Sequence, residues 1–176
     1  MKTSSVLSLA CLSLVGWGVM ACHSNSQTAP PDNSAASANV TLKDYGPEPT
    51  VVNIDTYTMT NTNFRTALWT GSKLQVTLMS IPAGGEVGLE QHPDTDQFLR
   101  VEDGQAKVLM GDSKDSLTFT QMAEKDFAIL IPAGKWHNII NTGDKPLKLY
   151  SIYAPVMHPH GTIHKTFQEA EEADHH

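Results

Sequence analysis

Cysteine is almost absent from this chain of 176 residues, and its two cysteines, Cys11 and Cys22, both fall in the first 22 positions. The rest of the chain therefore has no disulfide and no thiolate that could act as a nucleophile or a metal ligand. Basic residues are also few, since 12 Lys and Arg stand against 19 Asp and Glu, a net charge of −7. Nucleic-acid binding needs a basic surface, so this balance argues against a nucleic-acid partner.

Motifs of nucleophilic and nucleotide chemistry are missing as well. The sequence contains no G-x-S-x-G elbow, no phosphate-binding glycine loop and no dinucleotide fingerprint. Gly84 and Gly85 lie in a predicted turn between strands and do not open a helix. Because no cysteine follows Cys22, any metal held by the rest of the chain must be bound by nitrogen and oxygen ligands.

The N-terminal 22 residues have the pattern of a signal peptide. Lys2 precedes an apolar run from Val6 to Met20, which is shorter than the ~20 apolar residues of a membrane span. Ala21 and Cys22 then form a lipoprotein-like cleavage site, with Cys22 as the candidate for lipidation. Residues 23–44, rich in small and polar residues, are predicted to be a flexible linker. We therefore expect a domain lipid-anchored in the periplasm or cell envelope, the alternatives being a secreted soluble protein or an uncleaved membrane anchor.

The remaining chain reads as a single all-β domain over residues 45–165. Strand patterns recur about every 8–12 residues with turn residues between them, which is typical of a sandwich or a barrel. Only residues 165–173 predict a short helix or disorder, and residues 166–176 form an acidic C-terminal tail. The predicted strands are 51–60, 74–81, 87–92, 98–102, 106–110, 116–120, 127–131, 136–141 and 147–153.

Four side chains from two segments are candidates for one metal site. Glu90 and His92 are two apart on a predicted strand, so both point to one face. A hairpin would bring Gln97 beside them, or Asp96 if the turn is one residue tighter; strand register favours Gln97. His137 follows a Pro-x-Gly corner on another strand. Two imidazoles, a carboxylate and an amide oxygen suit a divalent iron, manganese or zinc ion.

These segments resemble the two sequence motifs of the cupin superfamily. The first motif, G-x5-H-x-H-x3–4-E-x6-G, falls on Gly84, Glu90, His92, Gln97 and Gly104. The second, G-x5-P-x-G-x2-H-x3-N, falls on Asp126, Pro132, Gly134, His137 and Asn141. Every spacing fits, while Glu90, Gln97 and Asp126 depart from the usual residue types. The resemblance implies a jelly-roll β-barrel with its metal inside.

The resemblance also implies a range of functions. The likeness to small single-domain cupins, including the mannose-6-phosphate-isomerase-like group, implies that a bound metal acts on a small polar metabolite. Cupins often form homodimers, so the resemblance also implies a homodimer. One hypothesis is an enzyme, an oxygenase with iron or an isomerase, epimerase or lyase with zinc or manganese. The other is a non-catalytic binding domain for a sugar-like ligand that has lost or does not use a metal. The sequence identifies no catalytic residue.

A second histidine cluster lies near the end of the predicted domain. His158, His160 and His164 fall within seven residues of one another. One interpretation is a lid over the barrel mouth that supplies a proton-transfer histidine. The other is a strap packed outside the barrel. Lys107, Arg100 and Lys135 are the basic residues that a phosphorylated substrate would use.

Overall fold

The computed structural model describes residues 40–174. The predicted signal peptide, Cys22 and the predicted linker up to residue 39 lie outside these residues. The described elements, in chain order, are α1 Ile54–Thr60, β1 Arg65–Thr70, β2 Gln75–Ile81, β3 Glu90–Gln91, β4 Asp96–Asp103, β5 Gln105–Gly111, β6 Phe119–Glu124, β7 Ala128–Ile131, β8 Trp136–Asn141, β9 Leu147–Ala154, β10 Ile163–His164 and α2 Phe167–Asp174.

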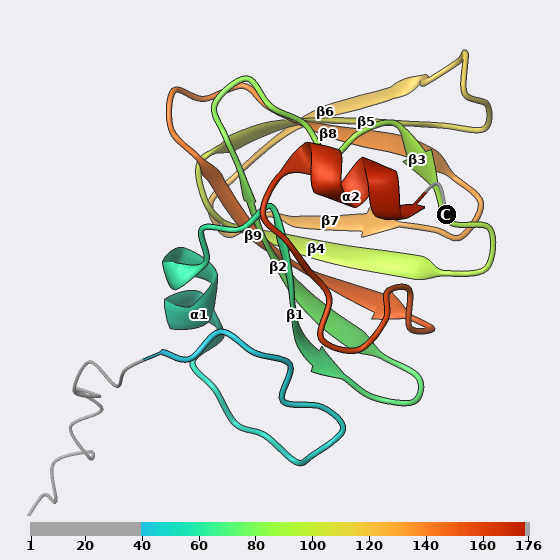
Figure 1. The fold of residues 1–176 in the computed structure, drawn as a ribbon. Helices are drawn as coiled ribbons and strands as arrows, with labels where there is room; N and C mark the ends of the chain where they lie inside the picture. The colour runs from blue at the N-terminus through green and yellow to red at the C-terminus, as the bar shows by residue number, and fades with distance from the viewer. Residues whose placement is uncertain (1–39, 175–176) are drawn as a thin grey trace, which may run out of the picture. The chain divides into compact units, whose positions relative to one another are not determined.

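Two antiparallel sheets form the domain (Figure 1). The larger sheet has the strand order β10-β1-β2-β9-β4-β7, and the smaller has the order β3-β8-β5-β6. Neighbours in each sheet are often distant in sequence, as when β9 pairs with both β2 and β4. This arrangement confirms the predicted single-domain jelly roll.

The interior is divided into a polar end and an apolar end. On the larger sheet, one inward row places Gln75 opposite Tyr153 and Tyr153 opposite Gln97. A deeper inward row consists of Met79, Leu149 and Val101. Leu99, Val101, Ile139 and Leu149 are all fully buried members of one apolar cluster. That cluster supplies the burial that stabilises the fold, and it leaves the polar row free for other roles.

The prediction of a first strand over residues 51–60 is wrong. Residues 51–60 were expected to be extended because of their β-branched and aromatic content, but Ile54–Thr60 form helix α1. The side-chain oxygen of Asn53 accepts a hydrogen bond from the backbone N–H of Thr56, which caps the helix. The hydroxyl of Thr58 bonds the carbonyl of Ile54 one turn back, so a residue that favours strands is accommodated.

Three other strands also differ from the prediction. Strand β1 was not predicted, because it begins at an arginine and its sequence, RTALWT, does not alternate between polar and apolar residues. Strand β6 starts at Phe119, three residues after the predicted start, because Ser113 and Ser116 first close a turn. The predicted strand over 87–92 shrinks to Glu90–Gln91, since Gly88 has a φ of 102°, which favours glycine and interrupts the strand.

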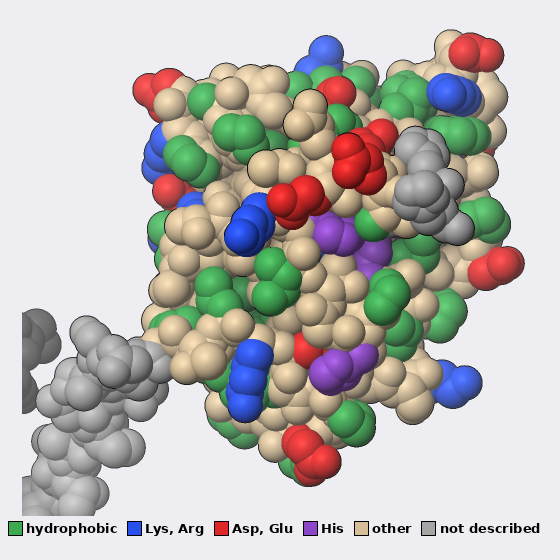
Figure 2. All heavy atoms as spheres, viewed as in Figure 1, with side chains coloured by type: hydrophobic (Ala, Val, Ile, Leu, Met, Phe, Trp, Pro, Cys, Tyr) green, Lys and Arg blue, Asp and Glu red, His purple; other side chains and the backbone are tan. Residues whose placement is uncertain are grey.

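Helix α2 packs on the domain and is not a free tail. Its Phe167 makes an edge-to-face contact with Phe64, with ring centroids 5.6 Å apart, and its Ala170 is buried. A Cβ at Gly88 would lie 3.1 Å from the Phe167 ring, so the helix also closes against this glycine. Acidic side chains gather over α2, with histidine beside them (Figure 2). Among residues 40–174, no helix is long and apolar enough to cross a membrane.

Asp44 fastens the start of the described chain to the domain. Its carboxylate accepts hydrogen bonds from the backbone N–H groups of Gly46, Thr70 and Gly161, and from the Thr70 hydroxyl. Burial acts to raise the pKa of Asp44, but these hydrogen bonds outweigh it and hold the pKa below its ordinary 3.8. The packed part of the chain therefore includes Asp44, before residue 45, and helix α2, after residue 165.

We expect Asp44→Asn to lower the free energy of unfolding by about 2–3 kcal/mol, because the amide has a single acceptor oxygen and puts an NH2 donor where the second carboxylate oxygen accepts. The lowered pKa means that the wild-type advantage is complete above pH ~4 and is lost as the pH falls through the folded-state pKa. Urea unfolding at neutral and acidic pH measures both effects. The exposed Asp115 provides the control, since Asp115→Asn should change stability by less than ~0.5 kcal/mol. Equal effects of the two variants at neutral pH would contradict the anchoring role.

Candidate metal centre

Glu90, His92 and His137 meet at the polar end of the interior. Strand β3 pairs with β8 so that Glu90 lies directly opposite His137. Nε2 of each imidazole is 3.2 Å from Oε1 of Glu90. One potential ligand atom from each of the three residues lies within 4.8 Å of the others. The side chains of His92 and His137 are 6% and 0% exposed, and that of Glu90 is 19% exposed. A cation held here would be almost wholly enclosed by protein.

Glu90 remains an anion in this setting. Burial acts to raise its pKa, but its contacts with His137 and His92 outweigh burial, so the pKa falls well below the ordinary 4.5. The cluster therefore offers a carboxylate at neutral pH, although the carboxylate lies in a largely water-free interior. A buried carboxylate needs a compensating positive partner.

The contacts of the two ring nitrogens of His137 require a positive charge between His137 and Glu90. Nδ1 lies 3.0 Å from the carbonyl oxygen of Lys135, where it can only donate a hydrogen bond. A neutral ring with its proton on Nδ1 then directs the lone pair of Nε2 at the Glu90 carboxylate, 3.2 Å away. The two contacts agree only if the ring carries a second proton or if another cation lies between nitrogen and oxygen. Metal-bound histidines commonly donate their other N–H to a backbone carbonyl in this way.

His92 lies just past the end of β3, and its position is fixed through its backbone. Its carbonyl accepts a hydrogen bond of 2.8 Å from the N–H of Gly134, in the turn before His137. The amide of Gln91 donates to the Gly134 carbonyl, also at 2.8 Å. Within residues 40–174, Nδ1 of His92 has no hydrogen-bond partner, and Nε2 faces the Glu90 carboxylate 3.2 Å away. A buried imidazole nitrogen that faces a carboxylate in this way is suited to metal binding.

Gln97, and not Asp96, faces the interior. Gln97 is 3% exposed and lies opposite Tyr153, whose ring centroid is 5.7 Å from that of His92. Its Nε2 donates to the hydroxyl of Ser151 at 3.0 Å, which turns the amide so that Oε1 is buried with no partner among the described residues. Asp96 is exposed and accepts a hydrogen bond from the N–H of Ala133. Glu90, His92 and His137 could therefore hold a divalent ion, and Gln97 is buried opposite Tyr153, whose ring packs on that of His92.

Asn141 and Asp126, the other motif positions, serve the backbone. The side chain of Asn141 donates to the carbonyls of Ile81, Pro82 and Lys145 and accepts from the N–H of Gly143. This network closes the turn after β8, as expected for a structural asparagine. Asp126 has a φ of 73°, a left-handed conformation that glycine adopts most easily and aspartate tolerates.

The second histidine cluster divides into an inner and an outer part. His158 is 5% exposed, and its ring packs edge-to-face on Tyr153 at 5.1 Å. His164 lies on β10 opposite Arg65. His160 is exposed, and its Nε2 contacts the carbonyl of Gly46 and the carboxylate of Asp44. Only part of the predicted lid or strap is therefore placed near the metal centre.

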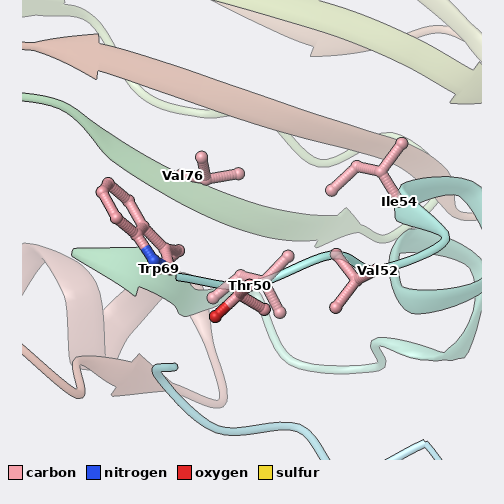
Figure 3. Close-up of a pocket in the computed structure, with 6 residues that line it drawn as sticks. Thr50, Val52, Ile54, Trp69 and Val76 are labelled. Atoms are coloured by element: carbon pink, nitrogen blue, oxygen red, sulfur yellow. The ribbon is translucent and has the colours of Figure 1, made fainter. Parts of the chain in front are cut away.

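A surface hollow of about 240 Å³ lies away from this centre, on the outer face of β1 and β2 (Figure 3). Its walls come from the N-terminal segment and from the two strands, and they are mostly apolar. Trp69 and Val76 lie opposite each other in the β1–β2 register. The lining residues are Thr50, Val52, Ile54, Leu68, Trp69 and Val76. With no titratable side chain, this hollow offers no chemistry of its own.

Two antiparallel sheets closed around a buried His/Glu cluster define a class of small jelly-roll proteins, and comparisons with known proteins identify the family. Residues 77–153 match the cupin domain model. The chain is 57% identical over 142 residues, 81% of its length, to the uncharacterized protein YrkC of Bacillus subtilis (strain 168), of which it covers 76%. This chain belongs to the cupin superfamily.

Solved structures agree with this assignment. The crystal structure of BH2720 from Bacillus halodurans has 59% sequence identity and a TM-score of 0.74, covering 74% of this chain and 99% of that chain. A conserved protein with a double-stranded β-helix domain from Klebsiella pneumoniae has a TM-score of 0.52 at 17% identity, over 68% of this chain and 100% of that chain. The latter likeness concerns the fold alone.

We expect Gln97→Met to weaken divalent-metal binding about 10- to 100-fold, because it removes the buried amide oxygen at nearly constant volume. Asp96→Asn, which changes the neighbouring outward residue, should leave the metal affinity unchanged. Competition with a chelator of known affinity measures both variants. The reverse order of effects would assign the fourth position to Asp96.

Proposed function

We propose that this protein is a metal-binding cupin that holds a divalent ion through Glu90, His92 and His137, with Gln97 as a fourth ligand or as a partner of metal-bound water. The observation that carries the proposal is the contact of His137 Nε2 with the Glu90 carboxylate at 3.2 Å, while Nδ1 of the same ring faces the Lys135 carbonyl. A cation between the two atoms would resolve that contact and could also be bound by Nε2 of His92, which faces the same carboxylate.

We further propose that the bound ion acts on a small polar metabolite. Bound iron would supply oxygen chemistry, whereas zinc or manganese would polarise a carbonyl or hydroxyl group. The chain's own residues exclude bulk water, since His92, Gln97 and His137 are all buried. Gln97 is oriented by Ser151 and would hold a substrate or water oxygen in place.

A role for His158 as a base is disfavoured by its surroundings. Burial, and next the positive charge of Arg65, lower the pKa of His158 to about 3. The ring is thus neutral at physiological pH and accepts a proton poorly. We therefore propose that His158 recognises the ligand and does not transfer protons.

We expect near-stoichiometric metal in the purified wild-type protein, made without a histidine tag and measured by elemental analysis. The double variant His92→Ala/His137→Ala should lose the metal, because it removes both nitrogen ligands. His160→Ala is the matched control, since His160 is exposed on the outside, and it should keep the metal. Changing His175 and His176 to alanine in all samples removes adventitious binding at the chain end.

Two outcomes of this measurement would change the proposal. If the wild type holds no metal after reloading with iron, manganese and zinc, the metal-dependent function is wrong. The protein would then be a non-catalytic, small-ligand-binding cupin. If metal remains in the double variant, the site lies elsewhere. A bound ion should also raise the melting temperature of the wild type, and only of variants that retain the ligands.

We also propose that the domain is lipid-anchored at Cys22 in the cell envelope. The support is the order of an apolar run, Ala21-Cys22 and a small, polar stretch in the sequence. We expect Cys22→Ser to move the protein from the membrane fraction to the soluble fraction of its host cells. Cys11→Ser is the matched control and should leave the protein with the membranes. A wild-type protein found in the soluble fraction would contradict the anchor.

A further inference from the structure

A row of apolar side chains crosses the outer face of the larger sheet. Phe98 of β4 lies opposite Leu130 of β7 on one side and opposite Ile152 of β9 on the other. Ile152 lies opposite Val76 of β2, and Val76 lies opposite Trp69 of β1. Residues opposite each other across strands share a face of the sheet, so these five residues form one apolar row across five strands. Figure 3 shows Trp69 and Val76 at one end of it.

The apolar row faces away from the interior of the barrel. The residues that alternate with it along β4 and β9, including Gln97, Leu99 and Ser151, are buried inside. Within the row, Leu130 is 69% exposed and the other four side chains are half-buried. The solvent face of an antiparallel sheet normally carries polar side chains. A continuous apolar row on such a face therefore indicates a contact surface.

The chain itself covers only one end of the apolar row. At β1 and β2, side chains of the N-terminal segment join Trp69 and Val76 in lining the hollow of about 240 Å³. At the other end, over β9, β4 and β7, a larger hollow of about 440 Å³ opens to the surface. Most of its lining is apolar, and these lining residues are Phe98, Leu130, Ile131, Pro132, Ile152 and Ala154.

This open end has a projecting side chain beside a hollow. Leu130 projects from β7, which is the edge strand of the larger sheet, and it also borders the hollow of about 440 Å³. That hollow is large enough to receive a leucine side chain. When two copies pair across a two-fold axis, the same patch of each meets the other. Leu130 of one copy can then enter the hollow of the second, and the reverse contact forms at the same time.

The width of the face also suits a second copy of this chain. Strands about 4.8 Å apart make the apolar row about 19 Å wide, and the 8 residues of β9 extend about 27 Å. This footprint is about 500 Å² before the relief of the side chains is added, of the order needed for the ~800 Å² per partner of a standard interface. A broad apolar sheet face is matched best by another sheet face, which a second copy supplies.

We propose that the apolar row is the core of a two-fold homodimer interface, in which the larger sheets of two copies pack face to face. Leu130 of each copy would enter the hollow beside Phe98 and Ile152 of the other. The inference goes beyond the proposed metal-binding function and does not rest on it. Burial of Phe98 and Ile152 would also stabilise the register of β4 and β9, in which the next pair inward is Gln97 with Tyr153.

The experiment measures the mass of the full chain in solution by sedimentation equilibrium. All samples carry Cys11→Ser and Cys22→Ser, so neither a disulfide nor a lipid can link two copies. Leu130→Asp places a charge at the projecting position, and Ala154→Arg fills the hollow from an exposed position on its wall. Met122→Asp is the matched control, because Met122 is 51% exposed on β6, the edge strand of the smaller sheet. The melting temperature of each variant reports folding.

We expect the reference protein to have the mass of two chains at micromolar concentration, with or without bound metal. Leu130→Asp and Ala154→Arg should each raise the dissociation constant of the dimer at least about 100-fold, because an unpaired charge would be buried twice in the symmetric interface. Met122→Asp should change it by less than about threefold. Leu130 and Ala154 are exposed in a single copy, so both variants should fold.

Three results would overturn this interface. The first is a reference protein that remains a single chain at the highest concentration measured. The second is a dimer that persists in Leu130→Asp and Ala154→Arg, and its loss in Met122→Asp would place the contact on the smaller sheet. The third is a single chain that floats with phosphatidylcholine vesicles unless Leu130 is changed, since the face would then meet lipid. A dimer that holds no metal would support the interface while the proposed function fails.

Discussion

The pairing of β8 with β3 is the constraint on which the metal centre depends. It places Glu90 directly opposite His137 and brings carboxylate oxygen and imidazole nitrogen to 3.2 Å. Because side chains alternate between faces, a slip of one residue would turn Glu90 outward and leave His137 alone in the interior. Strand β8 also pairs with β5, where Ile139 lies opposite Val108 in the apolar core. The burial of that core therefore also holds the register of the site.

Buried polar groups in this domain fall into two kinds. Asn141, Gln75 and Asp44 are satisfied by backbone groups, and each ties together segments that are distant in sequence. His92, Gln97 and His158 instead retain buried atoms without partners among residues 40–174. Leaving such atoms unsatisfied costs stability, and native proteins accept that cost mainly where a ligand will satisfy them. The contrast between the two kinds locates the functional end of the barrel.

Prediction from sequence succeeded where one local rule dominated. Strand β8 was predicted with its observed bounds, because alternating residues follow a Pro-x-Gly turn. It failed at Ile54–Thr60, where the cap formed by Asn53 outweighed the strand preference of the β-branched residues. It also missed β1, because Arg65 reads as a surface residue until neighbouring strands bury it. That omission concealed the one interior arginine among the described residues, and no local pattern would have found it.

The sequence by itself determined the cupin motifs, the all-β class and the residue types that could hold a metal, because spacing and alternation are local properties of a chain. Only the tertiary structure decided that Gln97 faces inward and Asp96 outward, that Nε2 of His137 meets Glu90, and that Arg65 and His158 are buried. These features arise from pairings between strands far apart in the sequence. The face on which a side chain lies depends on register, and register is fixed by the whole core.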